Sequence, residues 1–311
     1  MALPLIIDTD PGQDDAVALL LAFGSPDELE ILAVTTVAGN VPLELTTRNG
    51  LMMAELAGRP DVPVLAGCDR PMVRPLITAE YVHGKTGIDG ADLPPPTITP
   101  GARHAVDFII EAVRAHPGLT ICTLGPLTNL GTALQRAPDI AAGIDQVVMM
   151  GGGFFEGGNT TPAAEFNIYV DPHAADRVFR SGIRLVLMPL DVTHQALTSD
   201  ARVEAFRDLG NASGRATAGM LEFYERYDME RYGTAGAPLH DPTVIAYLLR
   251  PELFGGRRCW VEIETGSELT MGMTVVDWWR LTDHEPNCLV INEIDDDGFF
   301  ALLVDRIGRL P

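Results

Sequence analysis

The fold is decided near the N-terminus, where residues 3–24 read LPLIIDTDPGQDDAVALLLAFG. The first six residues form a short apolar run with two isoleucines, which predicts a buried β-strand over Leu3–Asp8. Pro11 and Gly12 end this strand, and the apolar body that follows predicts a helix over Asp14–Gly24. Because such a helix has almost no polar side, it must pack between a sheet and other elements. The stretch therefore indicates the strand–turn–helix unit of an α/β fold.

The same alternation continues along the chain. We expect further strands over Leu29–Val37, Val62–Leu65, Leu119–Leu124, Gln146–Met150 and Arg184–Leu190, and helices over Leu43–Ala57, Ala102–Ala115, Leu127–Arg136, Pro172–Ser181, Asp200–Leu209, Thr217–Tyr227, Asp241–Leu249 and Phe299–Ile307. This order predicts an open, mostly parallel sheet flanked by helices, with a Rossmann-like core. Residues 259–294 predict a smaller C-terminal part that contains β-structure. No repeat or linker divides the chain, so residues 1–311 are predicted to form a single domain.

Composition and charge narrow the possible functions. The chain has 22 basic and 43 acidic residues, which gives a net charge of −21. Binding to nucleic acid or to anionic lipid requires basic residues, so neither partner is expected. No apolar stretch approaches the ~18 residues of a membrane helix, and the N-terminus lacks the basic region of a signal peptide. Four dispersed cysteines without a C-x-x-C pair favour free thiols in a reducing cytoplasm.

Carboxylates crowd the turn between the first strand and the first helix. Asp8, Asp10, Asp14 and Asp15 lie within eight residues of one another. Like charges this close cannot all ionise without a counterion, and helix capping accounts for only one or two of the four. Oxygen ligands suit hard cations, and a flexible carboxylate set favours Ca²⁺. Because ligands of parallel sheets bind beyond the carboxyl ends of the strands, we expect a metal site at this edge.

These carboxylates belong to a longer series of motifs. Residues 8–16 resemble the signature of the inosine-uridine-preferring nucleoside hydrolase family. Further segments match the family in order: Val37–Asn40, His83–Gly84, Leu124–Asn129, Met149–Gly153, Asn159, Ala164–Asn167, His240–Pro242 and Thr274–Asp277. One short motif would be a weak signal, whereas this many in order is a specific one. The resemblance implies an enzyme that hydrolyses the N-glycosidic bond of ribonucleosides, such as inosine or uridine, to ribose and free nucleobase.

The resemblance also implies a role for each matching residue. The Ca²⁺ ligands of the family match Asp10, Asp15, Asp241 and the backbone carbonyl of Leu124. Asp10 matches the general base that activates a metal-bound water, and His240 matches an acid or base-recognition group. Other matching residues would bind the substrate: Asp14, Asn40, Met150, Asn159, Glu165 and Asn167 at the ribose, and His83 at the nucleobase.

Simple chemistry agrees with these roles. N-glycosidic cleavage passes through an oxocarbenium-like sugar, which negative charge stabilises. A bound Ca²⁺ would acidify the attacking water while Asp10 takes its proton. Binding of every ribose hydroxyl would fix the sugar for reaction. The segment from Tyr224 to Ala237 is expected to close over the nucleobase.

Several alternatives stay open. The enzyme could be specific for pyrimidine ribonucleosides, or the chain could be a Ca²⁺-dependent nucleoside-binding protein without turnover. Phosphatases of the haloacid dehalogenase type also carry Asp-x-Asp after a first strand, but Gly12 stands where that family has Thr or Val. The histidines without ligand-like spacing are expected in structural or surface roles: His104, His116, His173, His194 and His284. The expected partner is a small-molecule ribonucleoside, and the resemblance implies a homo-oligomer, either a dimer or a tetramer.

Overall fold

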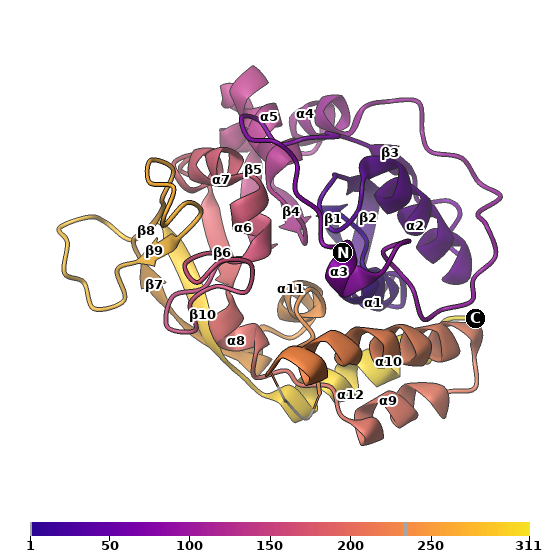
Figure 1. Cartoon of the computed structure of the whole chain (residues 1–311). Coiled ribbons are helices and arrows are strands. Elements are labelled where there is room, and N and C mark those ends of the chain that lie inside the picture. The colour runs from indigo at the N-terminus through magenta and orange to yellow at the C-terminus, as the bar shows by residue number, and fades with distance from the viewer. Residues whose placement is uncertain (1, 233–235) are drawn as a thin grey trace.

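A computed structural model describes residues 2–232 and 236–311, with the side chains of residues 227–232 left out. Among these residues, eight strands form one sheet in the order β3–β2–β1–β4–β5–β6–β10–β7 (Figure 1). The strands are β1 (Leu3–Thr9), β2 (Leu29–Thr36), β3 (Val64–Ala66), β4 (Leu119–Thr123), β5 (Ile144–Met150), β6 (Arg184–Met188), β10 (Cys288–Ile294) and β7 (Phe254–Cys259). Every neighbouring pair is parallel except β10 and β7. The mostly parallel sheet expected from the sequence is confirmed.

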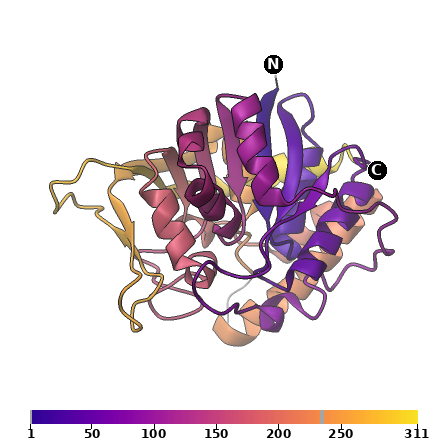
Figure 2. The same ribbon diagram turned by 90° about the horizontal axis from the view of Figure 1, so that it is seen from above.

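Helices cover both faces of the sheet (Figures 1 and 2). They are α1 (Gln13–Phe23), α2 (Leu43–Leu56), α3 (Glu80–His83), α4 (Ala105–Ala115), α5 (Thr128–Arg136), α6 (Phe166–Val170), α7 (Pro172–Phe179), α8 (Leu190–Thr193), α9 (Asp200–Arg207), α10 (Ala212–Tyr232), α11 (Pro242–Leu249) and α12 (Asp296–Ile307), with 3₁₀ turns at Pro138–Gly143 and Pro251–Leu253. None of the described helices combines the length and the apolar character that crossing a membrane requires.

Two hydrophobic cores lie on opposite faces of the sheet. Successive side chains of a strand point to opposite faces. Leu5 and Ile7 therefore join the core under α1, α10, α11 and α12, whereas Ile6 joins the core under α4, α5 and α7. Both faces of β1 are buried, which explains its continuous apolar run.

Helix α1 is buried along its whole length, as its apolar sequence predicts. It contacts α2, α10, α11 and α12. The carboxylate of Asp15 accepts a hydrogen bond from the N–H of Gly12 at 2.9 Å, which satisfies a backbone donor before the first turn. Beyond the helix, a Cβ on Gly24 would lie 2.3 Å from the carbonyl oxygen of Arg306, so only glycine allows α12 to pack this closely. Helix α1 thus holds the carboxylates of the first turn in a fixed, buried position.

The C-terminal part differs in detail from the expectation. Strands β7 and β10 extend the central sheet, and only β8 (Val261–Ile263) and β9 (Thr274–Val276) form a separate hairpin. The strand expected to reach Leu190 ends at Met188, because Pro189 has no N–H to donate to a neighbouring strand, and α8 begins at the next residue.

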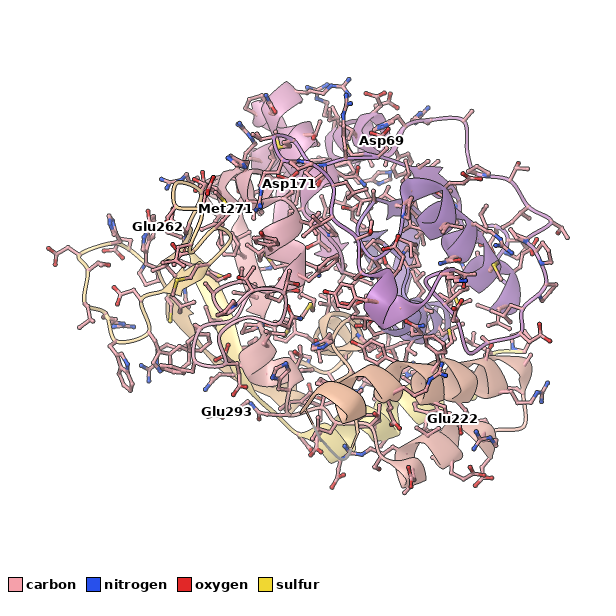
Figure 3. The ribbon with its side chains drawn as sticks, viewed as in Figure 1. Asp69, Asp171, Glu222, Glu262, Met271 and Glu293 are labelled. Carbon is pink, nitrogen blue, oxygen red and sulfur yellow. The ribbon has the colours of Figure 1, made fainter. Side chains whose placement is uncertain are left out.

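A buried carboxylate fixes the long segment between β3 and α4. Asp171, labelled in Figure 3, accepts hydrogen bonds from the N–H of Met72, the hydroxyl of Thr128 and the N–H of Ala174, at 2.8, 2.8 and 3.0 Å. These bonds tie the segment to α5 and α7. The segment continues into α3, which presents His83 to the cavity described next.

Candidate active site

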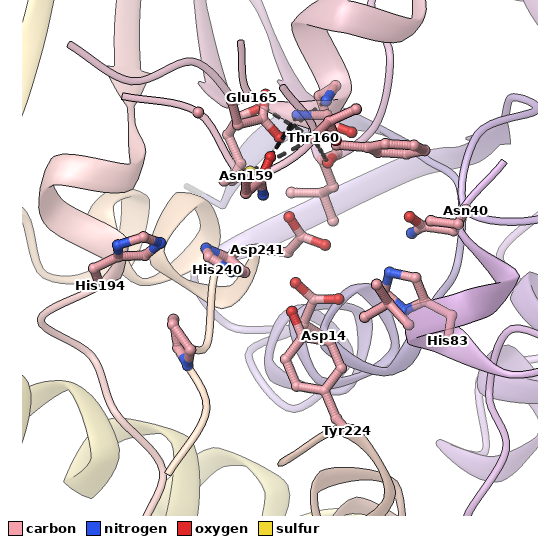
Figure 4. A pocket seen from close by; sticks show the side chains of 18 of the residues that line it. Asp14, Asn40, His83, Asn159, Thr160, Glu165, His194, Tyr224, His240 and Asp241 are labelled. Atoms are coloured by element: carbon pink, nitrogen blue, oxygen red, sulfur yellow. Dashed lines mark hydrogen bonds between the residues drawn. The ribbon is translucent and has the colours of Figure 1, made fainter. Parts of the chain in front are cut away.

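A cavity of about 420 Å³ opens beyond the carboxyl ends of the central strands. Ten of the twelve residues predicted to form the site line it: Asp14, Asn40, His83, Leu124, Met150, Asn159, Glu165, Asn167, His240 and Asp241. The other two, Asp10 and Asp15, are fully buried and bonded to residues of the cavity wall. Figure 4 shows Asp14 and Asp241 near the middle of the cavity, with Asn40 and His83 on one side and His240 on the other. The fold thus brings together side chains from both ends of the chain.

Hydrogen bonds hold Asp10 and Asp15 in place below the cavity. Asp15 Oδ2 accepts from Gly12 N and Asn40 Nδ2 at 2.9 and 3.0 Å, and its Oδ1 accepts from the hydroxyl of Thr9. Asp10 Oδ2 accepts from Asn40 N at 2.7 Å. Asp10 Oδ1 is buried and has no hydrogen-bond partner among the described residues. A buried carboxylate oxygen without a partner indicates a place for a cation, a water or a ligand.

Two glycines shape the space around Asp10. A Cβ on Gly39 would lie 2.0 Å from Asp10 Oδ2, and a Cβ on Gly125 would lie 2.1 Å from Asp10 Oδ1. Each distance is shorter than any contact that real Cβ atoms make, so only a glycine hydrogen fits on either side. The backbone after β2 and the backbone after β4 therefore fix this carboxylate between them.

The electrostatics of the cluster favour a bound cation. One carboxylate oxygen from each of Asp14, Asp15 and Asp241 lies within 4.8 Å of the others. Burial, and then the charge of Asp15, raise the pKa of Asp14 to about 8. Burial and the neighbouring carboxylates also raise the pKa of Asp10 and of Asp241 well above the ordinary range. A divalent cation would relieve this repulsion, and an all-oxygen donor set is the one that hard cations prefer. The chain therefore has residues that fit a metal ion.

The close trio does not coincide with the predicted ligand set. It includes Asp14, which the resemblance places at the ribose, and it does not include Asp10. The predicted backbone ligand, the Leu124 carbonyl, accepts a hydrogen bond from Asn167 Nδ2 at 2.7 Å. Asp14, Leu124 and Asp241 nevertheless all line the cavity, and Asp10 and Asp15 are hydrogen-bonded to Asn40 in its wall.

His240 stands next to Asp241, which precedes the first residue of α11. The Nδ1 atom of His240 lies 2.7 Å from the hydroxyl oxygen of the buried Thr193. Burial, and then the proximity of His194 and His83, lower the pKa of His240 to about 3. At neutral pH this ring is uncharged, so it acts as a hydrogen-bonding group.

His83 is fixed by a residue that the sequence did not single out. Its Nδ1 lies 2.8 Å from Gln13 Oε1, and Gln13 Nε2 donates to the carbonyl of His83 at 3.0 Å and to that of Asp89 at 3.1 Å. The ring also stacks on Tyr224, with centroids 5.7 Å apart and planes inclined by 29°. Burial lowers the pKa of His83 to about 3.

Backbone N–H groups hold the polar side chains around α6. Glu165 caps this helix and accepts from the N–H groups of Asn167 and Ile168, and its Oε2 also accepts from Gly152 N at 2.9 Å. Asn159 Oδ1 accepts from Phe166 N at 2.9 Å. Burial raises the pKa of Glu165 to about 7. These contacts orient the side chains that line this side of the cavity.

Besides Gln13, the structure shows further polar residues at the site that the sequence analysis missed. Thr193 bonds His240, and both Glu156 and His194 line the cavity. The sequence analysis expected a structural or surface role for His194, and the structure places its side chain on the wall of the cavity. The useful signal was its place just after a predicted strand end, where ligand-binding groups gather. Tyr224 also lines the cavity, whereas the side chains of residues 227–235, in the segment expected to close over the nucleobase, lie outside those described.

Comparison with known proteins shows the family to which the chain belongs. The family model described as inosine-uridine preferring nucleoside hydrolase matches residues 5–301. The chain belongs to this family. It is an N-glycosidase that acts on ribonucleosides.

Its relatives differ in what their names say about the nucleobase. This nucleoside hydrolase is 55% identical over 309 residues to an uncharacterized protein of Schizosaccharomyces pombe, covering 99% of each chain. It is 48% identical over 310 residues to the pyrimidine-specific ribonucleoside hydrolase RihA of Salmonella paratyphi B, again covering 99% of each. The solved structure of the purine-preferring ribonucleoside hydrolase from Gardnerella vaginalis matches with a TM-score of 0.92, 33% identity and 98% coverage of both chains.

Proposed function

We propose that this nucleoside hydrolase is a Ca²⁺-dependent enzyme that converts pyrimidine ribonucleosides to ribose and free nucleobase. The observation that carries this proposal is the partnerless, buried Oδ1 of Asp10, next to the Asp14–Asp15–Asp241 trio at the base of the cavity. A set of carboxylate and carbonyl oxygens favours Ca²⁺ over softer metals. The bound ion would lower the pKa of a water and hold the 2′- and 3′-hydroxyls of ribose.

Asp10 is the proposed general base. The N–H of Asn40 binds its Oδ2, so its Oδ1 is the oxygen available to take a proton from the attacking water. The negative charge of the surrounding aspartates would stabilise the positive sugar that forms as the glycosidic bond breaks. We propose Asp10, Asp15, Asp241 and the Leu124 carbonyl as the protein ligands of the ion.

Side chains on the cavity wall, all but one of them polar, would hold the ribose. We assign this role to Asp14, Asn40, Met150, Asn159, Glu165 and Asn167. The side chains of Asn159 and Glu165 are already fixed by backbone N–H groups, so little conformational entropy is lost when they bind a hydroxyl. Tight binding of the sugar would align its anomeric carbon with the water.

The nucleobase would lie against His83 and His240. Because burial lowers the pKa of both rings to about 3, neither stores a proton at neutral pH. This supports base recognition as the role of His240, the second of the two roles that the resemblance implies. The preference for pyrimidines is supported by the 48% identity to RihA, against 33% to the purine-preferring structure.

A ribose-release assay tests the proposal. We expect ribose from uridine and cytidine at rates above those for inosine and adenosine. With 2′-deoxyuridine we expect a rate lower by on the order of 100-fold, because one oxygen that binds the ion is lost. The isosteric Asp10→Asn variant should fold normally and release no ribose. If uridine raises the melting temperature but no ribose appears from any nucleoside, the chain binds nucleosides without turnover and the proposal is wrong.

Two further predictions concern the state of the protein. The homo-oligomer implied by the resemblance predicts a mass of two or four chains in light scattering. A cytoplasmic location is supported by the four cysteines, all of which are free.

A further inference from the structure

The cavity wall beyond the aspartates carries a histidine that the proposed ribose site does not use. His194 directly follows α8, one residue after Thr193, which bonds His240. The rings of His194 and His240 have centroids 5.8 Å apart and planes inclined by 55°. Figure 4 shows His194 on the far side of His240 from Asn40. A nucleobase that lies against His240, as proposed above, would therefore also come near His194.

A carboxylate orients the ring of His194. Its Nδ1 lies 3.2 Å from Glu156 Oε2. The segment that carries Glu156 is held in turn by Asp191 of α8, whose carboxylate accepts from the N–H groups of Phe154, Phe155 and Glu156 at 2.9, 2.8 and 3.2 Å. One short helix therefore both presents the histidine and anchors the residue that orients it.

This orientation determines which atom of the ring is available to a ligand. Since the carboxylate of Glu156 can only accept, Nδ1 carries the proton, and Nε2 of the neutral ring is a hydrogen-bond acceptor. No hydrogen bond from another described residue reaches this Nε2. The side chain of His194 is 35% exposed and lines the cavity, so a ligand has access to it.

We propose that His194, oriented by Glu156, binds the nucleobase by accepting a hydrogen bond at Nε2 from a ring N–H. Uracil offers such a donor at N3 and hypoxanthine at N1. Cytosine and adenine have a lone pair at the corresponding nitrogen, which would face the lone pair of Nε2. His194 thus selects uridine over cytidine and inosine over adenosine. This inference rests on the proposed placement of the ribose at the aspartates.

The test compares substrates that differ at the ring N–H. The variants are His194→Phe, which keeps a flat ring without Nε2, and His116→Gln, a control at an exposed histidine outside the cavity. The substrates are uridine, 3-methyluridine, which lacks the N3–H, and p-nitrophenyl riboside, which has no nucleobase. At pH 8, we expect His194→Phe to lower kcat/KM for uridine about tenfold, mainly through KM. For 3-methyluridine and p-nitrophenyl riboside the change should stay within about twofold.

A second pair of variants tests the role of Glu156 as a positioning residue. Glu156→Leu should reproduce the tenfold loss on uridine, and Glu156→Gln should restore most of the activity, because its amide oxygen still accepts from Nδ1. An equal loss on all three substrates would assign His194 a structural role, and no loss on uridine would exclude the contact; either result overturns the inference. If the unaltered enzyme cleaves p-nitrophenyl riboside but no nucleoside, the proposal that its substrates are nucleosides is wrong. If it cleaves neither compound, the proposed ribose site is wrong.

Discussion

Replacing Gly125 by alanine tests the space around Asp10. The new Cβ would lie 2.1 Å from Asp10 Oδ1 and 2.7 Å from its Cγ, whereas an ordinary contact is 3.4 Å or more. The carboxylate would have to move by more than 1 Å, the difference between 2.1 and 3.4 Å. It cannot move the other way without displacement of Gly39, whose own Cβ position is 2.0 Å from Oδ2. A 1 Å misplacement of a catalytic group costs on the order of 100-fold in rate.

We therefore expect Gly125→Ala to lower kcat/KM for uridine about 100-fold. The overpacking should also destabilise the fold by about 1–3 kcal/mol, which leaves a chain of this size folded at 25 °C. Ribose release measures the rate, and circular dichroism confirms the fold. Gly266→Ala is the matched control, since its nearest atom is the flexible end of Glu264 at 3.3 Å. An activity of Gly125→Ala within about threefold of the unaltered enzyme would show that the position of Asp10 does not limit the reaction.

Two more predictions concern neighbouring groups. Thr193→Val removes the hydroxyl that lies 2.7 Å from His240 Nδ1 and should lower kcat for uridine up to about tenfold. Thr120→Val, which removes a buried hydroxyl that has no partner among the described residues, should leave kcat unchanged. Equal rates in the two variants would contradict the role of the Thr193–His240 bond. Burial raises the pKa of Glu165 from 4.5 to about 7, so the folded chain holds a proton that the unfolded chain releases. The contribution of Glu165 to the free energy of unfolding should therefore fall by about 3 kcal/mol as the pH rises from 4.5 to about 7. In urea unfolding at saturating Ca²⁺, the free energy of unfolding should depend less on pH for Glu165→Gln than for the unaltered protein. An equal pH dependence in the two proteins would refute the raised pKa of Glu165.

Much of the fold was predictable because long, periodic segments carry strong signals. The apolar run Leu3–Asp8 and the apolar helix after it were placed within one or two residues, since both cores of the sheet depend on them. Short elements were missed. Helices α3, α6 and α8 have four or five residues, too few for a hydrophobic period, and are held by tertiary hydrogen bonds. The single domain over residues 1–311 stays a prediction.

The candidate site was predictable where several ionisable side chains lie close together in the sequence. Four carboxylates within eight residues indicate a cation, whatever the fold. By contrast, Gln13 and Thr193 act on histidines far away in the chain, at separations of 70 and 47 residues. Nothing in the local sequence distinguishes such residues from ordinary polar ones. Their roles become visible only when the sheet places the strand ends side by side.

Calorimetric titration of metal-free protein with Ca²⁺, with ribose release from uridine measured on the same samples, tests the account most directly. We expect one tight Ca²⁺ site per chain and activity that returns in proportion to the occupancy of that site. Asp241→Asn should lose both the site and the activity while it keeps its fold. Full activity in the metal-free protein, or unchanged Ca²⁺ binding by Asp241→Asn, would contradict the claim that distant aspartates converge on one catalytic ion.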